Sequence, residues 1–275
     1  HMKKKALSNI YIALIMLFLY APMAVMVVMS FNGTSSTSVL SGFSLKWYGE
    51  LFNDRITLQA LSNTLVLTIT SSILALIIGT LAAVGINAMR KKWIKNAVLT
   101  VTNIPMMNPE IVTGVSMMLL FVFVGHLVTT SDVLGFPTLL IAHVTFNLPY
   151  VILSVLPKLK QTDKHLGEAA QDLGCTPVSA FFKVILPNIS SGIITGFIMA
   201  VTLSLDDFII SYFVSSPKFQ TLPIVIFSMT KKKVKPDMYA LSTLIFVTVL
   251  VLLILMNVMQ ARAENKQKIK QTKQV

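Results

Sequence analysis

Six long apolar runs with almost no charged residues dominate the 275-residue sequence. The hydrocarbon core of a bilayer is about 30 Å thick, and an α-helix needs about 20 residues to cross it. The runs have this length, so the sequence predicts an all-α integral membrane protein with six transmembrane helices. We expect residues 1–275 to form a single transmembrane domain. The predicted helices cover residues 10–30, 62–89, 97–124, 134–157, 188–214 and 238–261.

The composition agrees with a membrane protein and excludes several other classes. Hydrophobic residues make up 54% of the chain and charged residues 12%, against about 25% charged residues in soluble domains. The net charge of +12 is carried at the ends of the apolar runs, which favours membrane lipid and no nucleic acid as a partner. The single cysteine, Cys175, and the unclustered histidines predict no metal site. His143 is expected to be a satisfied histidine in helix packing.

The distribution of Lys and Arg predicts the orientation in the membrane. If both termini are cytoplasmic, the N-terminus, the 90–95 turn, the 158–187 loop and the tail place 16 basic residues inside against 7 outside. The positive-inside rule therefore favours cytoplasmic N- and C-termini. Most of the outside basic residues form one group that this orientation does not explain: Lys218, Lys231, Lys232, Lys233 and Lys235.

Three acidic residues interrupt the apolar runs. Glu110 lies in the third run beside Pro105 and Pro109, so that helix is expected to be kinked or broken. Asp206 and Asp207 lie in the fifth run. A carboxylate at membrane depth is costly unless it faces a cavity or a partner, which makes all three candidates for a substrate path. The alternative is a structural hydrogen bond to the end of a broken helix.

Helix geometry limits how these carboxylates can act together. A rise of 1.5 Å per residue allows Glu110 and the two aspartates to share one layer in the outer half of the membrane. Adjacent helix positions point about 100° apart, so Asp206 and Asp207 cannot both face a pore equally, and one could bind backbone instead. Phe208 and Tyr212 follow the aspartates, and Tyr212 is a candidate to lie against a cation on the substrate path. The alternative for both aromatic residues is packing against lipid.

The loop at residues 158–187 carries the most specific pattern in the chain. It is too polar to cross the membrane and too long for a simple helix connection. Glu168-Ala169-Ala170 is followed, after three intervening residues, by Gly174. After nine further intervening residues comes the sequence Val184-Ile185-Leu186-Pro187.

The residue types in this loop are suited to docking another surface. Leu166, Ala169, Ala170 and Leu173 recur at helical spacing, and the small alanines allow close approach. Gly174 can end this helix and reverse the chain, and a proline like Pro187 suits the first turn of the following helix. An ordinary amphipathic helix at the membrane surface is the alternative.

This pattern resembles the EAA loop of binding-protein-dependent ABC importer permeases, with Val184 at the family's isoleucine position. The resemblance implies a type I ABC importer permease fold whose central cavity opens alternately to each side. It also implies that residues 158–187 are a cytoplasmic coupling loop that docks on an ATPase subunit. The coupling residues would be Glu168, Ala169, Ala170, Gly174, Leu186 and Pro187.

Further segments resemble the C-type permease of bacterial spermidine/putrescine importers. They are Ser30-Phe31-Asn32, Phe43 with Lys46-Trp47-Tyr48, Asn63-Thr64-Leu65, Pro109-Glu110-Ile111-Val112, His143 with Asn147-Leu148-Pro149-Tyr150, and Leu203-Ser204-Leu205-Asp206-Asp207. The resemblance implies a multi-pass permease of the bacterial plasma (inner) membrane that imports polyamines. Its implied partners are a second homologous permease, two ATPase subunits and an external polyamine-binding protein.

The chain itself is not expected to be an enzyme. It contains no G-x-x-x-x-G-K-[ST] phosphate loop, so we expect no cofactor in this chain and assign ATP and Mg to the partner ATPase subunits. Two alternatives stay open at this point. One is an ABC permease for another solute, such as an opine, ferric ion or another organic cation. The other is a secondary cation transporter, which would need an inverted repeat that the sequence does not display.

Overall fold

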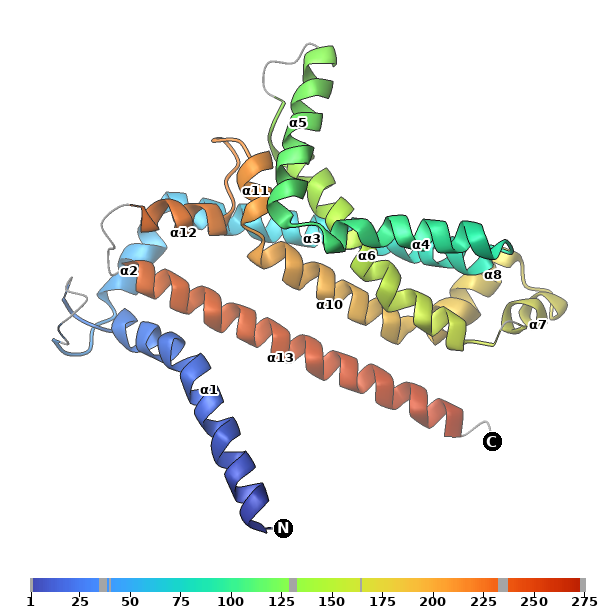
Figure 1. Ribbon diagram of the computed structural model, residues 1–275, viewed down its shortest axis with the longest axis horizontal. Helices are drawn as coiled ribbons and strands as arrows, with labels where there is room; N and C mark the ends of the chain where they lie inside the picture. The colour runs from blue at the N-terminus through green and yellow to red at the C-terminus, as the bar shows by residue number, and fades with distance from the viewer. Residues whose placement is uncertain are drawn as a thin grey trace. The chain divides into compact units, whose positions relative to one another are not determined.

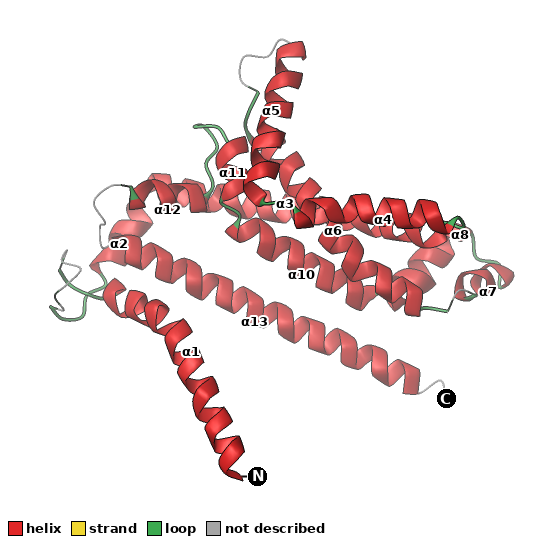
Figure 2. Cartoon of the chain, viewed as in Figure 1, coloured by secondary structure: helices red, strands yellow, loops and turns green. Residues whose placement is uncertain are grey.

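The computed structural model describes residues 2–34, 39, 41–128, 133–163, 165–231 and 237–272 (Figure 1). Within those ranges the regular structure is helical, apart from two isolated bridges that pair Asn32 with Phe43 and Ser216 with Phe219 (Figure 2). This confirms the all-α prediction. Of the basic residues that the predicted orientation places outside the cell, three are not among the described residues: Lys232, Lys233 and Lys235.

The chain divides into two compact units. One contains the residues up to Gln59 together with Val225–Leu252, and the other contains Ala60–Ile224 together with the residues from Leu253. Both predicted functional regions, the 158–187 loop and the intramembrane carboxylates, lie in the second unit.

Five helices of the described chain are long and apolar enough to cross a membrane. They are α1 (Met2–Ser30), α3 (Arg55–Ala88), α5 (Glu110–Val128), α6 (Phe136–Gln161) and α13 (Asp237–Thr272). A sixth span results if Pro177–Asn188 and Ser190–Asp206, which are bent by 73° at Ile189, are counted together. The predicted six-helix membrane fold is therefore reproduced with one span bent.

The predicted third helix is two helices, as its prolines indicate. Helix α4 (Lys92–Met107) contains Pro105, and α5 begins at Glu110 after a break at Asn108 and Pro109. Asn108 has φ −76° and ψ 142°, because a residue that precedes proline is forced out of the helical region. The break places Glu110 in the first turn of a new helix.

The predicted fifth helix, 188–214, is also divided, which its sequence alone did not predict. Helix α10 (Ser190–Asp206) is followed by α11 (Ile209–Val214). At the junction Asp207 has an extended backbone, with φ −61° and ψ 117°. The physical cause is the Asp207 carboxylate, which provides new acceptors for the first amides of α11, as described below.

Glycines allow close packing of α6 against its neighbours in the second unit. Val151 of α6 is fully buried, and a Cβ added at Gly79 of α3 would lie 2.7 Å from its Cγ1. On α10, a Cβ at Gly192 would lie 2.8 Å from the backbone oxygen of Ser154, and one at Gly196 would lie 3.3 Å from the Val151 Cα. Membrane helices associate through such small residues because lipid provides no hydrophobic drive between them.

The first unit contains a compact turn between α1 and α2 (Lys46–Asn53). The buried indole of Trp47 donates a hydrogen bond of 2.6 Å to the backbone oxygen of Asn32. Phe31 stacks on Phe43 at 5.3 Å, and the Tyr48 hydroxyl lies 2.8 Å from that of Ser30. These contacts fix the chain where it leaves α1. Helix α12 (Leu222–Thr230) follows α11 in the chain and has residues in both units.

We expect Gly192→Ala to destabilise the protein. Its new methyl group would meet the backbone oxygen of Ser154, which cannot move without displacing α6, and overpacking of this kind costs about 1–3 kcal/mol. Gly85→Ala on α3 is the control, because nothing lies within 4 Å of its Cβ position. The thermal unfolding midpoint of the protein in detergent should fall for Gly192→Ala and not for Gly85→Ala. Equal midpoints would show that the α6–α10 contact tolerates the extra methyl group.

Candidate functional site

The first half of the 158–187 loop forms the short helix α7 (Leu166–Asp172). Glu168 lies in its first turn, and one carboxylate oxygen is 2.9 Å from Nδ1 of His165, with both side chains exposed. Ala169 is exposed and Ala170 is buried. The two alanines therefore lie on different sides of the helix, and only Ala169 is open to a partner.

Gly174 ends α7 and reverses the chain, as its position in the sequence predicts. Its φ of +89° is a conformation that side chains with a Cβ rarely adopt. The Gly174 amide donates to the Gln171 oxygen at 2.8 Å, and the Cys175 amide donates to the Ala170 oxygen at 3.1 Å. This pair of bonds is the Schellman arrangement, which satisfies the last carbonyls of a helix.

The second half of the loop leads into α10 through three short helical segments. They are α8 (Pro177–Ala180), a π-helical turn η1 (Phe181–Ile185) and α9 (Leu186–Asn188). Because Pro187 has no amide hydrogen for the Lys183 carbonyl and its ring would clash with that group, the widened turn before it relieves the conflict. Pro187 is thus in α9, just before the 73° bend, and not in the first turn of α10.

Leu186 connects this loop to the interior of the second unit. It packs on an apolar cluster that includes Val155 and Leu159 of α6, Ala83 of α3 and Ile189 at the bend. By contrast, the loop leaves three large apolar side chains open. Leu173 is 88% exposed, Val178 66% and Phe182 60%. Val178 and Phe182 were not singled out from the sequence, because exposure on a short irregular segment has no periodic signal.

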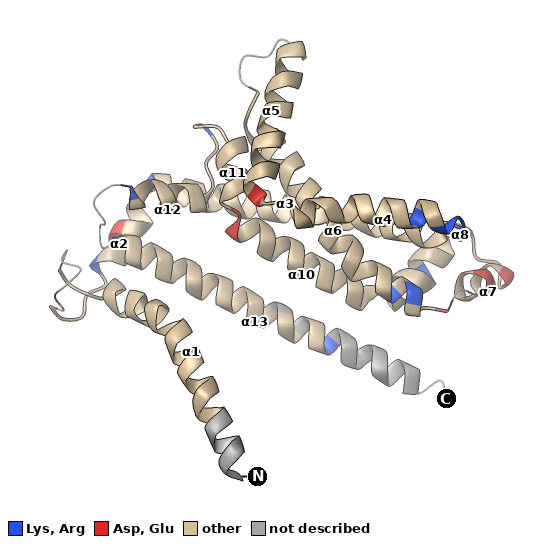
Figure 3. Ribbon diagram, in the orientation of Figure 1, with Lys and Arg blue, Asp and Glu red and all other residues tan. Residues whose placement is uncertain are grey.

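A cavity of about 370 Å³ lies where the two broken spans meet. Figure 3 shows acidic positions at the start of α5 and at the end of α10, amid long stretches without charge. These are Glu110 and Asp206, and both line the cavity with exposed side chains. Three aromatic rings also line the cavity: Phe146 and Tyr150 from α6, and Phe208 from the break after α10. The other lining residues are Pro105, Thr113, Leu203, Asp207, Ile209 and Ile210.

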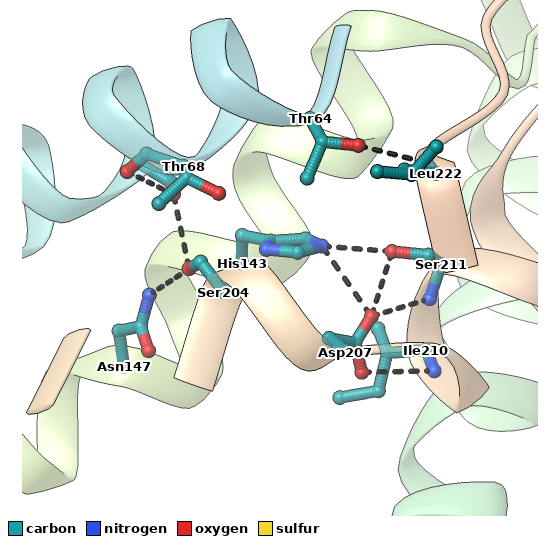
Figure 4. Close-up of polar contacts among 10 residues, drawn as sticks. Thr64, Thr68, His143, Asn147, Ser204, Asp207, Ile210, Ser211 and Leu222 are labelled. Atoms are coloured by element: carbon teal, nitrogen blue, oxygen red, sulfur yellow. Dashed lines mark hydrogen bonds and ion pairs between the residues drawn. The ribbon is translucent and has the colours of Figure 1, made fainter. Parts of the chain in front are cut away.

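Asp207 differs from Asp206 because its carboxylate is committed to the backbone. The Asp207 side chain is only 5% exposed. It accepts hydrogen bonds from the Ser211 amide at 2.8 Å, the Ser211 hydroxyl at 2.7 Å and the Ile210 amide at 3.3 Å (Figure 4). The two aspartates thus have separate environments, as predicted, although Asp207 lies in the extended junction after α10 and not on the helix.

His143 completes this arrangement from α6. Its fully buried ring places Nε2 3.0 Å from the Ser211 hydroxyl and 3.5 Å from the Asp207 carboxylate. The sequence predicts a satisfied helix-packing histidine here, and the contact with Ser211 confirms it, but the sequence does not name the partners. The signal available in the sequence was its spacing of four residues from Asn147, which puts two polar groups on one face of an otherwise apolar helix.

These polar side chains belong to one buried layer between two apolar clusters. On α3 the order is Leu67, Ser71 and Ala75, in which the serine lies between members of the two clusters. The Ser71 hydroxyl is 3.2 Å from that of Ser204 on α10, which also accepts a 2.8 Å hydrogen bond from Asn147. Thr64 of α3 is also buried, and its hydroxyl oxygen accepts a hydrogen bond of 2.8 Å from the Leu222 amide (Figure 4).

Tyr212 lies beside the cavity and does not line it. Its ring packs on Phe208 at 5.5 Å and on Phe213 at 5.6 Å, and the side chain is 47% exposed. Its place on a substrate path stays a prediction. Among the described residues no three His, Cys, Asp or Glu side chains gather in a way that could hold a metal ion.

The fold is that of a known class of membrane transport protein. Residues 75–269 match the family described as "Binding-protein-dependent transport system inner membrane component". The chain therefore belongs to this family and is a permease protein of the inner membrane.

Two relatives indicate which transport systems within this family the chain resembles. The chain is 39% identical over 253 residues to the putrescine transport system permease protein PotI of Escherichia coli, covering 92% of this chain and 90% of that protein. It is 37% identical over 254 residues to the spermidine/putrescine transport system permease protein PotC of Haemophilus influenzae, covering 92% and 96%. The chain is thus homologous to polyamine ABC transporter permeases.

Solved structures agree on the fold. A bacterial ABC transporter involved in the import of alginate superposes with a TM-score of 0.74 at 19% identity, over 95% of this chain and 96% of that chain. The MetNI methionine ABC transporter superposes with a TM-score of 0.61 at 18% identity, over 75% and 95%. The ABC importer permease fold expected from the loop pattern is confirmed.

The two aspartates should differ in their effect on stability. Asp207→Leu removes the acceptor for two backbone amides, and a buried donor left unpaired costs about 1–3 kcal/mol. Asp206→Leu is the matched control, since that side chain is exposed. Thermal unfolding in detergent should show a lower midpoint for Asp207→Leu alone. A larger loss for Asp206→Leu would contradict the assignment of Asp207 as the structural carboxylate.

Proposed function

We propose that this chain is the permease subunit of an ATP-driven importer that moves polyamines, such as spermidine and putrescine, into the bacterial cell by alternating access. The observation that carries the proposal is the cavity at the two helix breaks, where exposed carboxylates from α5 and α10 stand among three aromatic rings. The similarity to permeases of putrescine and spermidine systems supports the same substrate class.

The chemistry of the cavity suits a chain of ammonium groups joined by methylenes. Glu110 and Asp206 are acceptors for charge-assisted hydrogen bonds from ammonium groups. Phe146, Tyr150 and Phe208 can lie against ammonium groups through cation–π attraction, and they offer apolar surface to the methylenes. Glu110 is also at a helix N-terminus, where a negative charge is stabilised by the helix dipole.

The energy source lies in partner subunits under this proposal. Two ATPase subunits would bind ATP and Mg and hydrolyse the nucleotide, because this chain lacks a phosphate loop. A second homologous permease would complete the pathway, and an external binding protein would deliver the polyamine. The membership of a binding-protein-dependent family supports this assembly over a secondary cation transporter.

The 158–187 loop is the proposed docking site for an ATPase subunit. Glu168 and Ala169 are exposed on α7, and Leu173, Val178 and Phe182 expose apolar surface beside it. Large apolar groups left open on a polar segment mark a surface that a protein partner covers. Gly174 would fix the angle of α7, while Leu186 and Pro187 would pass its movement to the bend before α10.

Neutralising the cavity carboxylates should reduce polyamine transport. In the reconstituted complex with its binding protein, Glu110→Gln and Asp206→Asn should each lower ATP-dependent uptake of labelled spermidine or putrescine by about tenfold, as expected for loss of a charge-assisted hydrogen bond. Glu50→Gln is the control, because Glu50 pairs with Lys46 at an exposed position outside the cavity. Full uptake in both cavity variants, with complexes assembled normally, would refute the proposed substrate path.

Changes in α7 and at Gly174, which follows it, should weaken docking of the ATPase subunits. Gly174→Asp forces a side chain onto a backbone at φ +89°, and Glu168→Lys reverses the charge of the first turn. Both should reduce copurification of the ATPase subunits and abolish uptake. Asp163→Asn is the control, since this side chain accepts a hydrogen bond from the His165 amide before the helix and an Asn side-chain oxygen can accept it as well. Normal ATPase binding and normal uptake in both α7 variants would contradict the docking role.

A further inference from the structure

A side chain from a different helix contacts the residues at the break between α10 and α11. Asp207 precedes α11 and Ser211 lies within it, and His143 of α6 contacts both. The Nε2 atom is 3.0 Å from the Ser211 hydroxyl oxygen and 3.5 Å from the Asp207 carboxylate oxygen that the same hydroxyl contacts. One ring nitrogen therefore touches both sides of the break.

The hydrogen-bond directions determine how His143 takes part. The Ser211 hydroxyl donates its proton to Asp207 at 2.7 Å, so the hydroxyl oxygen is left to accept. His143 must then be the donor, with its proton on Nε2. Its Nδ1 has no hydrogen-bond partner among the described residues, which fits an unprotonated nitrogen better than a buried N–H group.

This contact has a consequence for the cavity. The residues on either side of Asp207 are Asp206 and Phe208, and both line the cavity. Their directions are set by the backbone at Asp207, which is extended where a continuous helix would turn them elsewhere. A contact that fixes the Asp207 carboxylate therefore also fixes the position of Asp206, which is proposed to bind an ammonium group, and of the Phe208 ring.

We propose that His143 is a positioning residue: its Nε2–H group holds the Asp207–Ser211 cap and thereby keeps Asp206 and Phe208 directed into the cavity. His143 itself touches no substrate. The inference rests on the proposed function only for the use of the cavity, and the geometry of the break can be tested without any solute.

The test measures how readily a thiol at position 206 is reached from the cavity. Cys175 is the only cysteine of the chain, so Cys175→Ser gives a background in which Asp206→Cys is the single thiol of this subunit. The full transporter complex is treated with a small cationic methanethiosulfonate in the absence of polyamine, and the labelling rate of this subunit is measured.

In this background His143→Leu should slow labelling at position 206 by about tenfold, the shift expected when a buried hydrogen bond to a charged network is lost. His143→Gln, which keeps an N–H donor, should restore the rate to within about twofold of the parent. Asn147→Leu is the matched control. Asn147 is equally buried one turn further along α6 and contacts α10 through Ser204, away from the break.

Two results would overturn the proposal. One is an unchanged labelling rate in His143→Leu, and the other is an equal change in His143→Leu and Asn147→Leu, which would indicate general loosening of the α6–α10 contact. If His143→Leu does not assemble, Ser211→Ala removes the bridging hydroxyl and is judged by the same criteria.

A second measurement keeps this proposal separate from the proposed function. Spermidine is added to the complex with Phe208→Cys, in which Asp206 is retained. Protection of the thiol at position 208 from the methanethiosulfonate is recorded. Protection supports a polyamine in the cavity. The labelling rate at position 206 could depend on His143 while spermidine gives no protection at position 208. This result would leave the positioning role intact and count against the polyamine assignment.

Discussion

Where a helix breaks at membrane depth, its backbone amides and carbonyls lose their hydrogen-bond partners, and hydrocarbon cannot replace them. The second unit of this protein is organised around one such break, between α10 and α11. Each unpaired amide or carbonyl in that environment costs several kcal/mol. At the start of α11 the Asp207 carboxylate accepts from two backbone amides, and Ser211 and His143 contact the same oxygen. Because one aspartate is used in this way, its neighbour Asp206 is left with an exposed carboxylate.

The break near Glu110 has a different physical cause, and it lies at the same cavity. Pro109 forces Asn108 out of the helical region, so α4 ends and α5 begins with an acidic residue in its first turn. One break is thus set by the covalent geometry of proline and the other by side-chain hydrogen bonding. Both expose a carboxylate to one cavity, and a continuous helix at either place would have carried that side chain past it.

These two causes explain how much the sequence could predict. Proline acts on its own neighbours, so the break of the third span and the chain reversal at Gly174 were both readable from local residues. The break at Asp207 depends on His143, which is 64 positions away in the chain and is found only when α6 and α10 pack. Angular separation predicted that the aspartates would differ, yet it could not decide which of them faces the cavity. The roles of Phe146 and Tyr150 were likewise hidden, because an aromatic residue on an apolar helix has the same pattern whether it meets lipid or a cavity.

The proposed coupling has a direct structural route along α10. This helix has 17 residues, which corresponds to about 25 Å, and it lies between the bend at Ile189 and the break at Asp207. Its glycines bring it so close to α6 that sideways displacement meets backbone atoms at once. A movement of the docking loop would enter at the bend through Leu186, which is packed on the apolar cluster around Val155. A rigid-body movement of α10 would carry the displacement to its far end. There it would reach the cap formed with His143 and Ser211, and because this cap sets the directions of Asp206 and Phe208, these two side chains would move with it.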